Sequence, residues 1–326
     1  MNSIGTFILR SAGSMLSPSG TGGRLSVLIY HRVLEKTDPL FPGVVDAGRF
    51  ESQMIILKSL FNVLPLSEAV HRLKMGNLPS RAACVTFDDG YADNFKVALP
   101  ILRRQNIPAT FFVSTGYLDG GIMFNDKVIE TIRRLEWDRL DLSESGLGVH
   151  LLGSRAERLQ AVSNLLSGLK YKPMDERHRI MDEIADKAGL QFPGDIMMTA
   201  NEVRGLRDAG MEIGGHTVNH PILSKLDDKD ARAEIADGAA RLSEITGRQI
   251  RLFAYPNGIP GVDYLSGHVR MIEELGFDAA FTTAKGVAKR GSDYYQLPRF
   301  TPWDIGLSRF SLRLAGNLLQ TEVVKV

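Results

Sequence analysis

Two adjacent carboxylates, Asp88 and Asp89, stand out as residues that could do chemistry. They follow the apolar run 82–87 and precede Gly90, a pattern that predicts a buried strand delivering both acids at its carboxyl end. Folds that alternate strands and helices place their active sites at this end. One carboxylate could bind a metal ion while its neighbour moves protons. The alternative is a turn that ends the strand, because Asp-Gly pairs are common in turns.

A second pair of side chains, His216 and His220, could complete such a site. Two imidazoles at this spacing can share one metal ion, and neutral imidazole suits zinc, copper, nickel or iron. By themselves the histidines could equally be caps or hydrogen-bonding groups, and Pro221 places them in a loop. Both follow a predicted strand at 211–214. Because the exits of parallel strands share one face, one aspartate and two histidines can form a three-ligand site with positions open to water.

Predicted strands and helices alternate along most of the chain, which favours an α/β fold with a parallel sheet or barrel. The predicted strands cover 25–30, 61–64, 82–87, 109–113, 211–214, 252–255 and 279–282. The predicted helices cover 47–60, 94–105, 228–246 and 264–275, with further helices opening at 67 and 199. The helix at 199 begins with a capping box, Thr199 to Glu202, and stops at Gly210.

The stretch from 118 to 198 interrupts this alternation, and we interpret it as a helical insertion. Helix-like segments lie at 126–137, 155–169 and 175–188. Because the preceding strand ends near Val113, the ends of the insertion should emerge on the face that carries the ligands. We therefore expect the insertion over or beside the site, where it would influence the choice of substrate. The alternative is a remote packing or oligomerisation element.

The composition fits one large globular domain, since 44% of the 326 residues are hydrophobic and 24% are charged. We place this catalytic domain at 25–310, after an N-terminal extension (1–24) and before a C-terminal tail (311–326). The net charge of +1 and the scattered basic residues argue against a nucleic-acid partner. Cys84 is the only cysteine, which excludes an internal disulfide, and its place within a strand indicates a buried structural thiol.

The sequence also bears on localisation. No apolar run is long enough to span a bilayer, and the first 20 residues lack the apolar core and cleavage site of a standard signal peptide. We therefore predict a cytoplasmic protein without a transmembrane segment. The segment 4–16 could still lie on a membrane as a short amphipathic helix.

The two motifs together resemble those of a known family. Thr-Phe-Asp-Asp-Gly at 86–90 is followed, in order, by His-Thr-x-x-His at 216–220, and the helix and strand after the first motif, which end in the segment 107–113, are also similar. This is the pattern of the polysaccharide deacetylase family, carbohydrate esterase family 4, with its NodB homology domain. The resemblance implies a distorted (β/α) barrel that hydrolyses N-acetyl groups of a glycan with the help of a divalent metal ion, most often zinc.

The resemblance also implies roles for individual residues. Asp88 would be the general base, and Asp89 would bind the metal with His216 and His220. The third motif of the family supplies a backbone N–H for the developing oxyanion, and here the corresponding segment makes Asn257 the candidate donor.

The chain departs from the family pattern at two places. Ala254 stands where the third motif usually has an arginine that orients the base, so Arg251 or Arg299 would have to replace it. The late Leu-x-His motif, which supplies the general acid, is absent. The segment Tyr30-His31-Arg32 instead resembles the circularly rearranged branch of the family, which includes deacetylases of bacterial exopolysaccharides. We therefore predict that His31 is the general acid.

Three functions are compatible with this pattern. The first is a metal-dependent hydrolase that removes N-acetyl groups from a bacterial glycan, and its partner is the N-acetylated glycan. The second keeps the metal site but cleaves another acyl or amide group. The third is a carbohydrate-binding protein with a decayed site, for which Ala254 is the main argument.

Overall fold

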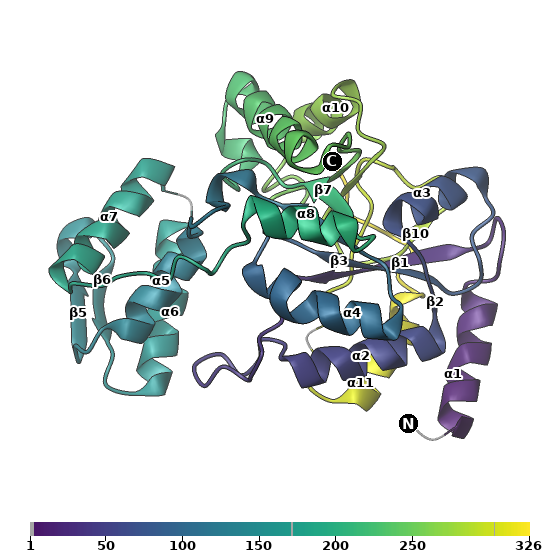
Figure 1. Ribbon diagram of the computed structural model, residues 1–326, viewed down its shortest axis with the longest axis horizontal. Helices are drawn as coiled ribbons and strands as arrows, with labels where there is room; N and C mark the ends of the chain where they lie inside the picture. Colours follow the sequence, from purple (N-terminus) through teal and green to yellow (C-terminus); the bar gives the residue numbers. More distant parts are fainter. Residues whose placement is uncertain (1–2, 171, 303) are drawn as a thin grey trace. The chain divides into compact units, whose positions relative to one another are not determined.

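The computed structural model describes residues 3–170, 172–302 and 304–326 (Figure 1). The chain forms two compact units. The first comprises residues up to 37, 43–118 and 198–326, and the second comprises 38–42 and 119–197. The second unit therefore nearly coincides with the predicted insertion, but it also includes 38–42, which the sequence pattern left in the catalytic domain.

An eight-stranded sheet forms the centre of the first unit, in the order β10-β1-β3-β4-β7-β8-β9, with β2 beside β3. Its pairs are parallel except for β1 with β10. The strands are β1 (Arg24–Tyr30), β2 (Asn62–Val63), β3 (Ala82–Phe87), β4 (Ala109–Val113), β7 (Glu212–Gly215), β8 (Leu252–Ala254), β9 (Ala279–Phe281) and β10 (Ala288–Lys289). Strands β1, β3, β4, β8 and β9 are largely apolar and buried because both faces of a parallel sheet are covered.

The segment 297–300 joins the two ends of the parallel part of this sheet. Leu297 forms a parallel bridge with Phe281 of β9, and Phe300 forms one with Leu28 of β1. Backbone hydrogen bonds of 2.7 to 3.0 Å accompany both bridges. The sheet therefore curls into a distorted (β/α) barrel whose parallel strands all end on one face, and the predicted fold class is confirmed.

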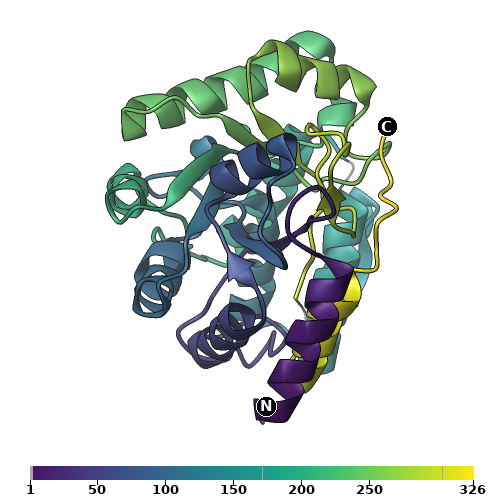
Figure 2. The same cartoon turned by 90° about the vertical axis from the view of Figure 1, so that its right-hand side faces the viewer.

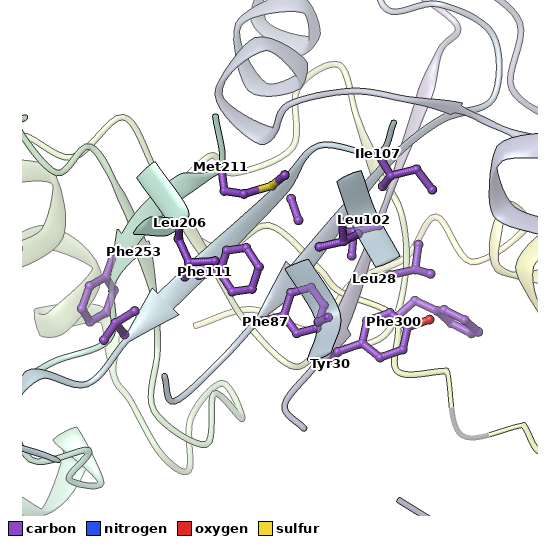
Figure 3. Packing of buried hydrophobic residues seen from close by; sticks show 14 of the residues in the cluster. Leu28, Tyr30, Phe87, Leu102, Ile107, Phe111, Leu206, Met211, Phe253 and Phe300 are labelled. Atoms are coloured by element: carbon purple, nitrogen blue, oxygen red, sulfur yellow. The ribbon is translucent and has the colours of Figure 1, made fainter. Parts of the chain in front are cut away.

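Successive strand residues contribute to two apolar cores, because their side chains alternate between the faces of the sheet. Val27, Cys84 and Phe112 belong to the cluster inside the barrel, where Cys84 is fully buried. Phe87 and Phe111 belong to the cluster between the strands and the outer helices, and their rings stack with centroids 4.7 Å apart (Figure 3). The strand ends are thus held between two packed layers.

Helices pack around the strands. They are α2 (Ala47–Leu60), α3 (Leu66–Met75), α4 (Leu99–Gln105), α8 (Ala200–Asp208), α9 (Asp228–Thr246) and α10 (Ser266–Glu274), and a π-helical turn, η1 (Asn94–Ala98), precedes α4. Helices α2, α8 and α9 begin at side-chain caps. The capping box predicted at Thr199 is present, with Glu202 and Thr199 bonded to each other's backbone N–H groups.

Two further helices, α1 (Ser3–Leu16) and α11 (Leu307–Asn317), lie side by side and pack against α2 (Figure 2). Phe310 and Leu314 of α11 are fully buried. The boundary predicted at 311 therefore falls inside a helix whose apolar face belongs to the core. Among the described residues, no helix is long and apolar enough to cross a membrane.

The second unit has its own apolar core. It contains the helices α5 (Phe124–Arg134), α6 (Arg155–Leu169) and α7 (Met174–Lys187) and the antiparallel strands β5 (Arg139–Leu142) and β6 (Gly148–Leu151). Leu140, Leu165 and Ile184 are among its buried residues. The sequence pattern indicated the three helices but not the hairpin, because only one residue of each four-residue strand is buried, which leaves too short an apolar alternation to recognise.

Candidate active site

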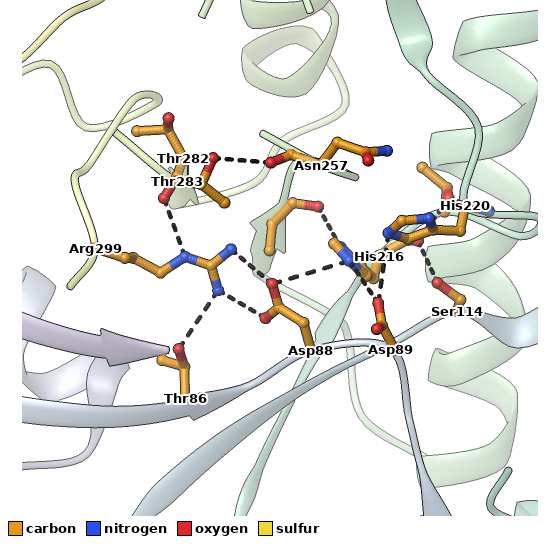
Figure 4. A network of polar contacts seen from close by, with 12 residues as sticks. Thr86, Asp88, Asp89, Ser114, His216, His220, Asn257, Thr282, Thr283 and Arg299 are labelled. Atoms are coloured by element: carbon orange, nitrogen blue, oxygen red, sulfur yellow. Dashed lines mark hydrogen bonds and ion pairs between the residues drawn. The ribbon is translucent and has the colours of Figure 1, made fainter. Parts of the chain in front are cut away.

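Separate segments deliver polar side chains to the carboxyl end of the barrel (Figure 4). Asp88 and Asp89 directly follow β3, and His216 directly follows β7. His220 lies in the loop after β7, and Arg299 lies on the segment that joins β9 to β1. The residues come together because parallel strands end on the same face, as the sequence pattern predicted.

The backbone is strained at this site. Asp89, Thr217, His220 and Asn257 have φ values of 78°, 66°, 52° and 59°, a conformation that L-residues rarely adopt. Each such residue costs about 1–3 kcal/mol, and strain of this kind concentrates at functional sites. The surrounding hydrogen bonds hold the backbone in this conformation. We infer that the conformation at these residues is set by where their side chains must lie, and not by the stability of the backbone itself.

Asp89, His216 and His220 form a cluster of the type that binds metal ions. Their candidate ligand atoms all lie within 4.8 Å of one another. The Nε2 atoms of His216 and His220 are each 3.4 Å from Oδ1 of Asp89. Nδ1 of His216 lies 2.7 Å from the carbonyl oxygen of Ala254, to which it donates, so Nε2 is the nitrogen left to face the aspartate.

The properties of these groups fit a divalent cation. Oδ1 of Asp89 is buried and makes no hydrogen bond with the described residues, an arrangement that is costly unless a cation binds there. Burial would raise the pKa of Asp89, but the nearby His216 and His220 imidazoles hold it well below its usual range. Burial lowers the pKa of His220 to about 4, so its imidazole is neutral at physiological pH, as a metal ligand must be.

Glu234 of α9 supports the loop that carries the histidines. Its carboxylate accepts hydrogen bonds from the backbone N–H groups of Val218 (2.9 Å) and Asn219 (2.8 Å) and from Nδ2 of Asn219 (2.7 Å). Gly238, one turn further along α9, permits the close approach, because a Cβ there would lie 2.8 Å from the Thr217 backbone. Sequence reasoning missed Glu234, since an acid within a helix carries no distinguishing pattern.

We predict that Glu234→Gln weakens metal binding about 10–100-fold, as the loss of a group that positions metal ligands commonly does. Glutamine keeps the shape but offers one carbonyl oxygen in place of two charged acceptors. Competition of the protein with a chelating dye for zinc measures the change. Glu244→Gln is the matched control, because Glu244 lies on the same helix, 71% exposed at its side chain, and pairs only with Arg241 among the described residues. Equal zinc affinity in the two variants would contradict this role for Glu234.

Asp88 is held by Arg299 in a buried, bidentate ion pair. Nη1 and Nη2 of Arg299 donate to Oδ1 and Oδ2 of Asp88, both at 2.7 Å. Nε of Arg299 donates to the carbonyl oxygen of Thr282 at 3.1 Å, so the guanidinium itself is fixed. Burial would raise the pKa of Asp88, but the positive charge of Arg299 keeps it below its ordinary value. The Asp88 carboxylate is therefore ionised and held in one orientation. Its Oδ2 atom lies 3.9 Å from Nε2 of His216.

Arg251, the other arginine predicted to orient the base, is not at the site. Its guanidinium pairs with Asp278 on the surface, at 2.6 and 2.9 Å, with almost half of its side chain exposed. Arg251 immediately precedes β8, whereas the site lies after the other end of this strand. Of the two candidates, only Arg299 contacts Asp88.

His31 follows β1 at the same end of the barrel, and its side chain is exposed. Its imidazole is close enough for its charge to contribute to lowering the pKa of Asp88 and Asp89. Two hydrogen bonds hold the backbone around His31 in place. Nδ2 of Asn94, the first residue of η1, donates to the His31 carbonyl at 2.8 Å, and the side chain of Asp93 accepts from the Val33 N–H at 3.0 Å.

Asn257 lies in the turn after β8. Its carbonyl oxygen accepts a hydrogen bond of 2.8 Å from the Thr283 hydroxyl. Its own backbone N–H donates to none of the described residues. His268, the last histidine of the chain, is 4% exposed and accepts the Leu265 N–H at 2.9 Å, so it caps its own helix.

Comparison with known proteins agrees with this fold. The model of the polysaccharide deacetylase family matches residues 75–144 and 170–280, more than half of the chain. YxkH of Bacillus subtilis is 21% identical over 278 residues, which cover 85% of this chain and 70% of that protein. A poly-beta-1,6-N-acetyl-D-glucosamine N-deacetylase of Staphylococcus aureus is 39% identical over 75 residues, 23% of this chain and 26% of its own. The solved structure of IcaB from Ammonifex degensii shares the fold, with a TM-score of 0.59 at 19% identity over 93% of this chain and 98% of that one.

The fold, the paired aspartates and the Asp-His-His cluster therefore define a NodB-type carbohydrate esterase. The chain belongs to the polysaccharide deacetylase family, and it is an enzyme of that class.

Proposed function

We propose that the protein is a zinc-dependent hydrolase that removes acetyl groups from N-acetylhexosamine residues of a bacterial polysaccharide or its precursor. The observation that carries this proposal is the ionised Asp88, held by Arg299, next to the cluster of Asp89, His216 and His220. One carboxylate and two imidazoles are a donor set that suits zinc. A divalent ion held there would polarise the acetyl carbonyl and lower the pKa of a water molecule to about 7.

The side chains around this position divide the remaining work. Asp88 accepts the proton of the attacking water, and Arg299 fixes the carboxylate in the orientation that this transfer needs. Arg299 supplies from another segment the arginine that Ala254 replaces in the third motif, which argues against a decayed site. The backbone N–H of Asn257 donates to the oxyanion that develops on the acetyl oxygen.

His31 protonates the sugar nitrogen as it leaves, because an amine leaves poorly as an anion. We expect His31→Ala to fold, retain metal and lose most of its turnover on N-acetyl substrates. Hydrolysis of an activated acetyl ester should fall much less, since its leaving group needs no proton. Rates on the two substrates measure the effect, with His71→Ala, an exposed histidine of α3, as the control. An equal fall on amide and ester, or no fall on either, would remove His31 from this role.

We further propose that residues 119–197 contribute to the choice of glycan. The support comes from the attachment points in the first unit: the Met198 N–H donates to the Gly90 carbonyl at 2.9 Å, and the Gly116 N–H donates to the Val218 carbonyl at 2.8 Å. Both ends of the insertion thus leave from loops that carry the site. A bound N-acetylglucosamine oligomer should slow amide hydrogen exchange within 119–197. Exchange that changes only outside this stretch would assign the insertion another role.

Acetate release from N-acetylglucosamine oligomers of β-1,4 and β-1,6 linkage tests the substrate class. The matched region of the Staphylococcus aureus deacetylase favours the β-1,6 polymer. We expect release from at least one oligomer, and preference between the linkages identifies the polymer. Release from acetyl esters of sugars, but from no N-acetyl oligomer, would instead support a hydrolase of another acyl group.

A further inference from the structure

Helix α1 is apolar on two faces. Leu9 and Leu16 pack against the core of the first unit. Phe7, Ile8 and Met15 are instead 71%, 59% and 77% exposed. At about 100° per residue these three side chains fall within roughly 100° of the helix circumference, so they form one exposed apolar stripe. The outer face of a helix that packs on a globular core is ordinarily polar, and this face is not.

Positive charge accompanies the stripe. Arg10 is exposed on α1, and it is the only charged residue between Ser3 and Leu16. Arg81 passes beneath the helix where Gly13 gives it room, since a Cβ on Gly13 would lie 3.2 Å from Cδ of Arg81. Burial and the positive charge of Arg10 both lower the pKa of Arg81. Neither guanidinium forms an ion pair with a described carboxylate.

Arg81 has a hydrogen-bond donor that remains unused. The residue is only 9% exposed, and its Nη1 donates to the carbonyl oxygen of Leu60 at 2.9 Å. Its Nε is buried without a partner among the described residues. A buried donor on a cationic side chain is costly to leave unpaired, so it indicates an absent acceptor.

An open hollow of about 490 Å³ joins these features. It is lined by Thr6, Phe7, Arg10, Ser11, Ser14 and Arg81. Its polar lining consists of hydroxyl and guanidinium groups, which are donors suited to phosphate oxygens. An apolar side chain from the exposed stripe forms part of the same wall.

We propose that α1 binds the surface of an anionic phospholipid bilayer, with the stripe Phe7, Ile8 and Met15 among the acyl chains and a lipid phosphate between Arg10 and Arg81. A helix of this kind lies in the membrane interface and gains affinity from buried apolar area and from attraction to anionic lipid. Charge selects this occupant over a second copy of the chain. Two copies joined through α1 would bring four guanidinium groups together without a carboxylate from either helix.

Sedimentation with vesicles of phosphatidylcholine, with and without phosphatidylglycerol, tests the proposal on the full chain. The protein should bind vesicles that contain phosphatidylglycerol and should be released by salt. Phe7→Ser/Ile8→Ser should weaken this binding tenfold or more. Arg10→Gln should weaken it about fivefold, the effect of about one cation near an anionic surface. Val149→Ser/Leu151→Ser, which removes side chains of β6 that are 46% and 54% exposed, should bind like the unaltered chain.

The proposal would be overturned by any of four results. One is the absence of vesicle binding by the unaltered chain, and another is unchanged binding in Phe7→Ser/Ile8→Ser. The third is a dimer in light scattering that this double variant dissociates, which would assign the stripe to self-association. Arg10-dependent binding of inorganic phosphate without vesicle binding would likewise replace the membrane with a free anion. Circular dichroism and unchanged acetate release from a soluble oligomer establish that the double variant is folded.

Discussion

Replacing Asp88 with asparagine should leave the metal bound and reduce turnover by roughly a hundredfold or more. Asparagine has nearly the same shape as aspartate but cannot accept the proton of the attacking water. The metal should remain because Asp89, His216 and His220 are unchanged and lie within 4.8 Å of one another without Asp88. Acetate release under saturating substrate and zinc content per chain are the two measurements.

Two controls separate proton transfer from damage to the fold. Asp88→Asn leaves the buried Arg299 without a charged partner, and breaking such a pair costs about 3–5 kcal/mol, so thermal unfolding must be followed alongside activity. Arg299→Met breaks the same pair from the other side and should also lower turnover, because the carboxylate loses its orientation and the charge that holds its pKa down. Full turnover in Asp88→Asn would move the general base to another group, and full turnover in Arg299→Met would remove Arg299 from its orienting role.

Replacing His220 with alanine should abolish tight metal binding and, with it, acetate release. The variant loses one of three protein ligands. Its affinity for zinc should therefore fall by much more than the roughly 10–100-fold that follows the loss of a group that only positions the ligands. Zinc content after dialysis and affinity by competition with a chelating dye measure the change. The effect should be larger than that of Glu234→Gln, which leaves all three ligands in place.

His71→Ala is the matched control for this loss, because His71 is an exposed histidine on α3 outside the cluster. It should bind zinc like the unaltered chain. Full zinc occupancy in His220→Ala would exclude His220 as a required ligand and would leave its left-handed backbone, with φ of 52°, without a function.

The residues that local sequence patterns revealed are those that directly follow apolar strands. Asp88, Asp89 and His216 were predicted at strand ends because the strands before them can be recognised in the sequence, and parallel strands must end on one face. The (β/α) barrel followed from the same alternation. The ends of the domain were harder to predict from the sequence. Helix α11 is a single amphipathic helix beyond the last strand, and its burial depends on contacts with α1 and α2.

Arg299 illustrates what local patterns could not decide. It was one of two arginines that could orient the base, and neither has a distinguishing neighbour in the sequence. The choice depends on the segment 297–300 bridging β9 and β1, a pairing between residues far apart in the chain. Glu234 was not predicted for a similar reason. Its three hydrogen bonds are to the loop after β7, which is distant from Glu234 in the sequence.

Titration of zinc into chelator-treated protein, with acetate release from an N-acetylglucosamine oligomer as the readout, tests the central claim most directly. We predict that release begins from a negligible rate, rises with added zinc and reaches its plateau at one zinc per chain. Asp88→Asn should bind the same zinc and stay near the starting rate throughout. Acetate release that is undiminished by the chelator, or that does not respond to zinc or any other divalent metal, would contradict the account.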